Sequence, residues 1–132
     1  KISVIGTYIK RCGNLIFIEE RAEVSDIAEL EACLEESFSS LRLMGVMCAF
    51  AAPSGAFIYV RDAVRIYNFF ETVIEACLDS LLKFRVHKES LIFCMEVESN
   101  ANLTSFFEIT DTSSYEDGVW RFTFTVKKAG EA

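Results

Sequence analysis

The sequence predicts an α+β domain built as a two-layer sandwich, with helices packed on one face of a sheet. Residues 64–84 carry apolar side chains at helical spacing, whereas in 91–98 and 119–127 a large apolar side chain recurs at every second position, a period of two. A helix with so broad an apolar face needs a sheet to cover it. We expect the sandwich to span residues 45–132 and a helical hairpin to span residues 1–44.

Composition limits the function classes. The chain has 132 residues, of which 52% are hydrophobic, so one substantial core is expected. Its formal net charge of −7 argues against a nucleic-acid surface, which needs clustered Lys and Arg. The longest apolar run, Val46 to Ala52, is too short to span a membrane, so no membrane segment is predicted.

The five cysteines are scattered and form no Cys-x-x-Cys pair. This pattern is typical of buried thiols in a reducing compartment, so we expect a cytoplasmic location. Cys77 and Cys94 have no neighbouring group in the sequence to activate a nucleophile, and packing is the expected role of both. The single histidine, His87, follows the long helix without a motif and is expected to be structural.

The first part of the chain predicts two helices, over residues 1–19 and from an N-cap at Ser25 to a C-terminal Gly45. The isoleucine-rich spacing of the first helix favours self-association, so a homodimer through these helices is expected. The same helix could instead fold back to cover the sheet. Because the sequence opens without Met and already in helical periodicity, we expect it to be a piece of a longer protein.

The remaining elements follow from local patterns. A buried strand is predicted at 46–52, a turn at Pro53 to Gly55, and a short strand at 57–60. After the long helix and the strand at 91–98, a helical turn is predicted at 103–107. The turn signal Glu116-Asp117-Gly118 then predicts a hairpin between 106–112 and 119–127.

An acidic stripe lies beside the apolar face of the long helix. Glu71, Glu75 and Asp79 are spaced four residues apart, which places them on one side of a helix. This is the feature of the sequence that could carry chemistry. Its alternative interpretation is a solvated helix face with no further role.

The stretch GVMCAFAAPSGAFIYVRDAVRIYNFFETVIEACLDSLL, which begins at Gly45, resembles the start of the ATP-binding domain of sensor histidine kinases. These belong to the GHKL or Bergerat-fold family of ATPases. In that family two strands and an aspartate lead into a helix that bears the N-box; Asp62 and the segment Glu71 to Ala76 match this layout. The final YEDGVWRFTFTVKKAG resembles the closing hairpin of such a domain, and the two early helices resemble the helical segment before it.

The resemblance implies a two-layer sandwich of the Bergerat ATPase type and assigns roles to three residues. Glu71 takes the position of the catalytic base, and Glu75 replaces the family's metal-binding asparagine, which would make it a magnesium ligand. Glu98 stands in for the aspartate that binds adenine. ATP and magnesium are the implied cofactors, and a response regulator is the implied partner of a bacterial two-component signalling protein.

The sequence departs from the family at the glycine boxes. Residues Glu98 to Asn102 contain no glycine where Asp-x-Gly-x-Gly is expected, and too few residues remain before the last hairpin for a nucleotide lid. A phosphate cradle needs a close backbone approach that side chains obstruct. The expectation is therefore a degenerate ATP-binding-type domain, inactive by itself, from a sensor histidine-kinase-like protein whose acceptor histidine would precede Lys1.

Two alternatives stay open at this point. The chain could be a non-catalytic regulatory or dimerisation module that keeps the sandwich as a scaffold. It could also be an unrelated small-ligand-binding α+β domain, which would need an apolar pocket under Phe106 and Phe107.

Overall fold

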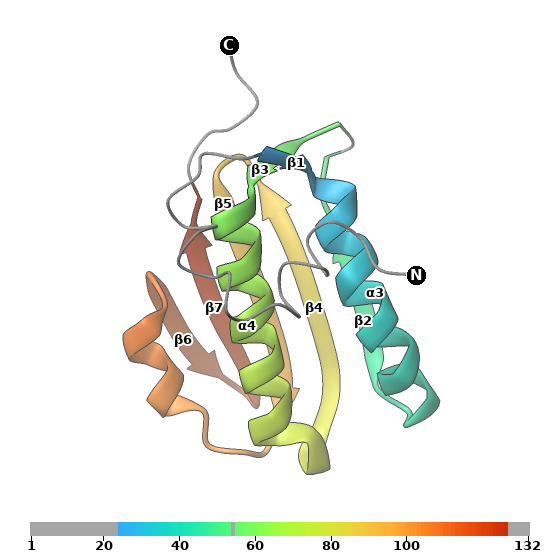
Figure 1. Ribbon diagram of the computed structural model, residues 1–132. Helices are drawn as coiled ribbons and strands as arrows, with labels where there is room; N and C mark the ends of the chain where they lie inside the picture. Colours follow the sequence, from blue (N-terminus) through green and yellow to red (C-terminus); the bar gives the residue numbers. More distant parts are fainter. Residues whose placement is uncertain (1–23, 54, 127–132) are drawn as a thin grey trace, which may run out of the picture.

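A computed structural model describes residues 24–53 and 55–126 of the chain. In this part of the chain, two α-helices lie on one face of a five-stranded sheet of order β2-β4-β5-β7-β6 (Figure 1). The predicted two-layer α+β sandwich is therefore confirmed. The elements are β1 Val24–Asp26, α3 Ile27–Leu43, β2 Met47–Ala51, β3 Phe57–Tyr59, α4 Val60–Cys77, η2 Leu78–Ser80, β4 Leu81–Glu89, β5 Ile92–Ser99, η3 Thr104–Ile109, β6 Thr112–Glu116 and β7 Val119–Thr125.

The sheet is mixed. β2 pairs with β4 in parallel, and the chain between them crosses over through β3 and α4. The other pairs, β4 with β5, β5 with β7 and β6 with β7, are antiparallel. A separate two-stranded sheet, formed by β1 and β3, lies where the chain enters α3 and α4. This small sheet holds the N-terminal ends of both helices together.

Helix α3 begins one residue later than the sequence predicts. Ser25 lies in β1, where it pairs with Ile58 and remains extended, so it cannot cap the helix. The cap is Asp26, whose carboxylate accepts a hydrogen bond from the backbone N–H of Ala28 at 2.9 Å. At the other end, Gly45 has a φ of +92°, consistent with its predicted place after the helix.

The long helix was predicted at 64–84, and both of its bounds are wrong. Helix α4 begins at Val60, so Asp62 lies within its first turn, and it ends at Cys77. Leu81 to Phe84 belong to β4, a strand that the sequence did not predict. A register irregularity between Leu81 and Lys83 places both Leu81 and Phe84 on the buried face, three residues apart, which imitates helical spacing.

The later strands agree better with expectation. The predicted strands at 46–52, 57–60, 91–98 and 119–127 correspond to β2, β3, β5 and β7. The helical turn is a 3₁₀ segment, η3, and it continues to Ile109, so the first strand of the last hairpin starts at Thr112 and not at Phe106. The turn of that hairpin lies at Asp117 and Gly118, as predicted.

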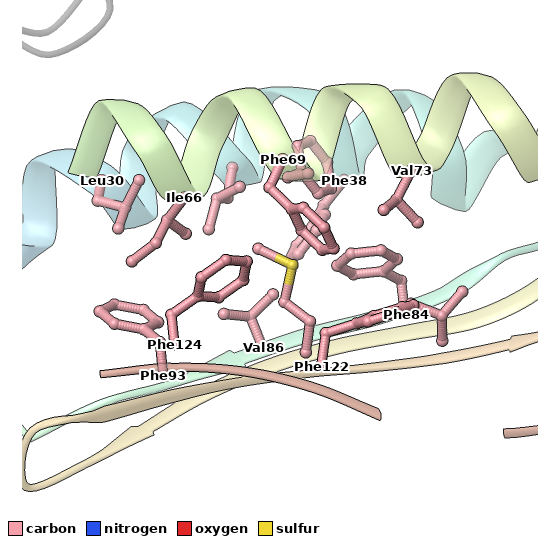
Figure 2. Packing of buried hydrophobic residues seen from close by; sticks show 14 of the residues in the cluster. Leu30, Phe38, Ile66, Phe69, Val73, Phe84, Val86, Phe93, Phe122 and Phe124 are labelled. Atoms are coloured by element: carbon pink, nitrogen blue, oxygen red, sulfur yellow. The ribbon is translucent and has the colours of Figure 1, made fainter. Parts of the chain in front are cut away.

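The core lies between the two helices and the sheet, and Figure 2 shows its side chains directed into that layer from both sides. Phe38 of α3, Phe70 of α4 and Phe84 of β4 meet there, with ring centroids 5.1 to 6.2 Å apart. All three are at most 1% exposed. Each such ring stabilises the fold by about 1.5–3 kcal/mol through removal from water.

Helix α3 directs its apolar face into this core. Its buried residues are Ile27, Leu30, Cys33, Leu34, Phe38 and Leu41. The helix was expected to pack along a seam with a first helix at 1–19, which lies outside the described residues. The structure shows that α3 packs on the sheet, so its apolar stripe is occupied there.

The opposite face of the sheet is polar, and no described helix covers it. We call it the open face. It is formed by the strand positions that alternate with the buried ones and includes Lys83, Arg85, His87, Cys94, Glu96, Glu98, Arg121 and Thr123.

Candidate functional site

The acidic stripe is on the outer side of α4. Glu71 and Glu75 are both exposed and lie one helical turn apart, because α4 runs without a break through both positions. Asp79 is also exposed, but it lies in η2, after the helix has ended. The stripe that the sequence predicts over three residues is thus a pair on the helix with a separate carboxylate beyond it.

Glu71 interacts with a tyrosine one turn earlier on the same helix. The pKa of Tyr67 is raised to about 12, chiefly by burial. A hydrogen bond with Ser37 of α3 acts to lower this pKa, whereas the charge of Glu71 and a hydrogen bond with its carboxylate act to raise it. Tyr67 also packs on Phe70, with ring centroids 5.8 Å apart. Glu71 is therefore held on the side of α4 that faces α3.

Glu98 lies in a different place. It is the last but one residue of β5, directly opposite Lys83 of β4, and its carboxylate lies 4.0 Å from the Lys83 ammonium. Val97, its neighbour in the strand, is fully buried on the helix side, so Glu98 is on the open face. The sheet therefore separates Glu98 from Glu71 and Glu75, and the three residues do not form one cluster.

A hydrogen-bonded turn follows β5, at the place where the kinase glycine box was expected. The Ser99 side chain accepts a hydrogen bond from the Ala101 N–H at 3.0 Å and shares one with the Ser80 hydroxyl at 2.6 Å. The Asn102 side chain accepts bonds from the backbone and side chain of Thr104, which starts η3. The chain thus passes directly from β5 into η3 without a glycine-rich loop.

The segment η3 packs on aromatic rings of α4 and β7. Phe106 packs on Phe69 of α4 at 5.7 Å, and Phe107 packs on Trp120 of β7 at 5.8 Å. Both also lie within 6.4 Å of Phe122. Both rings that were expected to cover an apolar pocket thus pack on other aromatic rings.

Sequence reasoning missed a cluster of charges on the open face. Glu96 accepts hydrogen bonds from both Arg85 and Arg121, which flank it on the neighbouring strands. The hydrogen bond from Arg121, together with that from Arg85, holds the pKa of Glu96 below its ordinary value although burial opposes this. The alternation of β5 predicts that Glu96 faces away from the core, but its partners depend on strand register, which the sequence does not reveal.

These features define a class of fold: a two-layer sandwich with a mixed sheet, a long helix on its face, and a closing hairpin. Solved structures of histidine kinases have this architecture. The chain is similar to the cytoplasmic segment of histidine kinase QseC, with a TM-score of 0.58 and 7% identity over 98% of both chains. It is also similar to the catalytic domain of histidine kinase ThkA, with a TM-score of 0.54 and 11% identity over 80% of this chain and 95% of that one.

A third similar structure is the histidine kinase AdeS of Acinetobacter baumannii, with a TM-score of 0.50 and 10% identity over 93% of this chain and 78% of that one. No family model and no curated protein matches the sequence. At these identities the likeness shows the fold. The expected fold, that of histidine kinase catalytic domains, is confirmed.

In the described part of the chain, no helix combines the length and the apolar character that a membrane crossing requires.

Proposed function

We propose that the chain is the ATP-binding-type domain of a sensor histidine-kinase-like protein of two-component signalling, in a degenerate form that transfers no phosphoryl group by itself. One observation supports the proposal: the fold is that of histidine kinase catalytic domains, while a hydrogen-bonded turn occupies residues 99–104, where the kinase resemblance places the glycine box.

The turn is poorly suited to phosphate because three of its N–H groups already have partners. Phosphate cradles present several free backbone N–H groups to the ligand. Here the N–H of Ser99 bonds to the Gly118 carbonyl, that of Ala101 to the Ser99 hydroxyl, and that of Thr104 to the Asn102 side chain. Binding a triphosphate at this position would require these bonds to break.

A second candidate function is residual binding of a magnesium nucleotide. The exposure of both Glu71 and Glu75 on one side of α4 supports it. Glu75 would ligate magnesium, which prefers carboxylate oxygens, and Glu71 would serve as the base. A carboxylate in place of asparagine adds negative charge beside a triphosphate, and Glu98, on the open face, would not reach the adenine.

Calorimetric titration with ATP and magnesium, on protein shown to be folded, distinguishes these functions. The degenerate domain is expected to show no binding heat at millimolar nucleotide. Micromolar binding that is lost in Glu75→Ala but kept in Glu89→Ala, an exposed acid at the far end of β4, would overturn the proposal in favour of the second candidate. Circular dichroism of both variants controls for folding.

The proposed partner of the parent protein is a response regulator. Histidine kinase ThkA has been solved in complex with the response regulator protein TrrA, and this chain is similar to that kinase with a TM-score of 0.50 and 13% identity. The matched region covers 93% of this chain and 49% of the ThkA chain. A regulatory or dimerisation module on the same scaffold, in a cytoplasmic signalling protein, would use the same partners without catalysis.

A further inference from the structure

The open face of the sheet brings together the single histidine, a buried cysteine and a buried glutamate. His87 of β4 lies directly opposite Cys94 of β5, and Glu96 is two residues further along the same strand. The alternate residues Val86, Phe93 and Met95 are at most 1% exposed and point to the helices, so this trio points the other way. It is separate from the acidic pair on α4.

The ligand atoms of these three side chains converge. One ring nitrogen of His87, the Sγ of Cys94 and a carboxylate oxygen of Glu96 all lie within 4.8 Å of one another. In a tetrahedral zinc site with bonds of about 2.0–2.3 Å, ligand atoms lie roughly 3.3–3.8 Å apart. Side-chain adjustments of about 1 Å would therefore close the trio around one ion.

The surroundings hold two of the ligands in place and leave the third accessible. Cys94 and Glu96 are 6% and 8% exposed, in the centre of the sheet, while His87 is half-buried beside Ala51 of β2. Because His87 is only half-buried and its strand neighbour Ala51 is exposed, solvent can reach the imidazole. An ion there would have three protein ligands and one position for water.

The arginines would act as outer partners. Arg85 donates one hydrogen bond to Oε1 of Glu96, and Arg121 donates two to Oε2, so Oε1 keeps a second lone pair for a metal. Both guanidinium groups are more than half exposed, so water screens their repulsion of a cation. A thiolate and a carboxylate together balance the two charges of the ion.

The chemistry of the trio selects the metal. Nitrogen, sulfur and oxygen from one residue each suit zinc or a similar borderline transition ion, whereas magnesium and calcium require oxygen ligands. We propose that His87, Cys94 and Glu96 bind one Zn²⁺ per chain on the open face of the sheet. Because burial raises the pKa of the Cys94 thiol, binding releases its proton.

The test uses the full chain, reduced and freed of metal with a chelator that is then removed. Titration with Co²⁺ should produce a thiolate-to-metal charge-transfer band that saturates at one equivalent and disappears when Zn²⁺ is added. Competition with a chromophoric chelator gives the zinc affinity. Loss of a ligand in His87→Ala or Cys94→Ser should weaken zinc binding by about 100-fold or more, beyond the effect of an outer partner.

Matched controls locate the site. Cys48→Ser changes a half-buried cysteine of β2 outside the trio, and Glu98→Gln changes the neighbouring acid of β5; both should bind as the unchanged chain does. Cys12→Ser tests whether the fifth cysteine, which lies outside the described residues, contributes to metal binding. His87→Ala alters a half-buried side chain and is expected to fold, which circular dichroism checks. The proposal is overturned if no Co²⁺ band forms, or if zinc binding survives both ligand variants or is lost in Cys12→Ser.

Discussion

At the scale of single residues, Tyr67 links the two helices at the point where Glu71 is exposed. Its hydroxyl interacts with Ser37 of α3 and with Glu71 of α4, and burial raises its pKa to about 12. A tyrosine whose folded-state pKa is raised binds its proton more tightly in the folded chain than in the unfolded one. Its contribution to stability is therefore present below pH 10 and is lost as the pH rises through about 12.

Replacement of Tyr67 by Phe tests this pH dependence. The unchanged chain should lose free energy of unfolding between pH 10 and pH 12, and Tyr67→Phe should lose less, because the late-titrating hydroxyl is gone. Denaturant unfolding at several pH values measures the difference. Tyr115→Phe, at an exposed tyrosine of β6, is the matched control. Equal pH slopes for Tyr67→Phe and the unchanged chain would contradict the assignment.

At the scale of elements, the last hairpin depends on its two turn residues. Asp117 and Gly118 have φ angles of +53° and +83°, which is the left-handed pair that a two-residue turn of type I′ requires. A Cβ added at Gly118 meets nothing within 4 Å, so the cost of a side chain there is in the backbone.

Substitution of Gly118 by Ala should therefore destabilise the chain by about 1 kcal/mol. Gly118→Asn should cost less, because asparagine adopts the left-handed region more readily than alanine. Urea unfolding followed by circular dichroism measures both. Ser114→Ala, on the exposed side of β6, should change stability by less than about 0.5 kcal/mol and serves as the control. If Gly118→Ala left the free energy of unfolding unchanged, the assignment of a type I′ turn at Asp117 and Gly118 would be contradicted.

The elements also show what the sequence could predict. Every second residue of β5 and β7 is a large apolar one, Phe93, Met95 and Val97 in the first and Trp120, Phe122 and Phe124 in the second, so periodicity was enough to identify both strands. Strand β4 was missed because its irregularity between Leu81 and Lys83 puts two buried residues three apart, in phase with the preceding helix. The residue at which a helix begins depends on tertiary pairing. Ser25 pairs with Ile58 of β3 and stays extended, so the cap of α3 is Asp26 and not Ser25.

The candidate sites were predictable to different degrees. The exposure of Glu71 and Glu75 follows from helical spacing, and the structure agrees with it. The separation of Glu98 from them requires knowing which way β5 faces at its end. The trio of His87, Cys94 and Glu96 depends on the register of two strands, one of which the sequence interpretation had placed partly in a helix. The roles that the kinase resemblance implies for Glu71, Glu75 and Glu98 stay predictions.

At the scale of the whole molecule, the packing of α3 bears on how two copies would associate. The apolar face of α3 is buried against the sheet, and its outer positions, such as Glu36 and Ser39, are polar and exposed. If the chain forms a homodimer through its N-terminal helices, the predicted isoleucine seam of residues 1–19 has to carry the contact.

Sedimentation equilibrium of the full chain tests this prediction. We expect a dimer that dissociates at least tenfold more readily in Ile5→Glu, because a charge in an apolar seam costs more than 1.4 kcal/mol, the equivalent of a tenfold change. Ser39→Glu, on the outer side of α3, should dimerise as the unchanged chain does. A monomer at all concentrations, or dissociation by Ser39→Glu alone, would contradict the prediction.

One residue of the closing hairpin gives the molecule its own optical reporter. Trp120 is the single tryptophan of the chain and is 5% exposed, with its indole N–H 3.4 Å from the Ser99 carbonyl and its ring beside Phe107 and Tyr115. Its fluorescence, excited selectively over that of the tyrosines, therefore reports on the contact between β7 and the turn at residues 99–104. Any ligand that opens this turn would change the emission, whereas an ion bound at His87 and Cys94, on the other face of the sheet, would leave the indole surroundings in place.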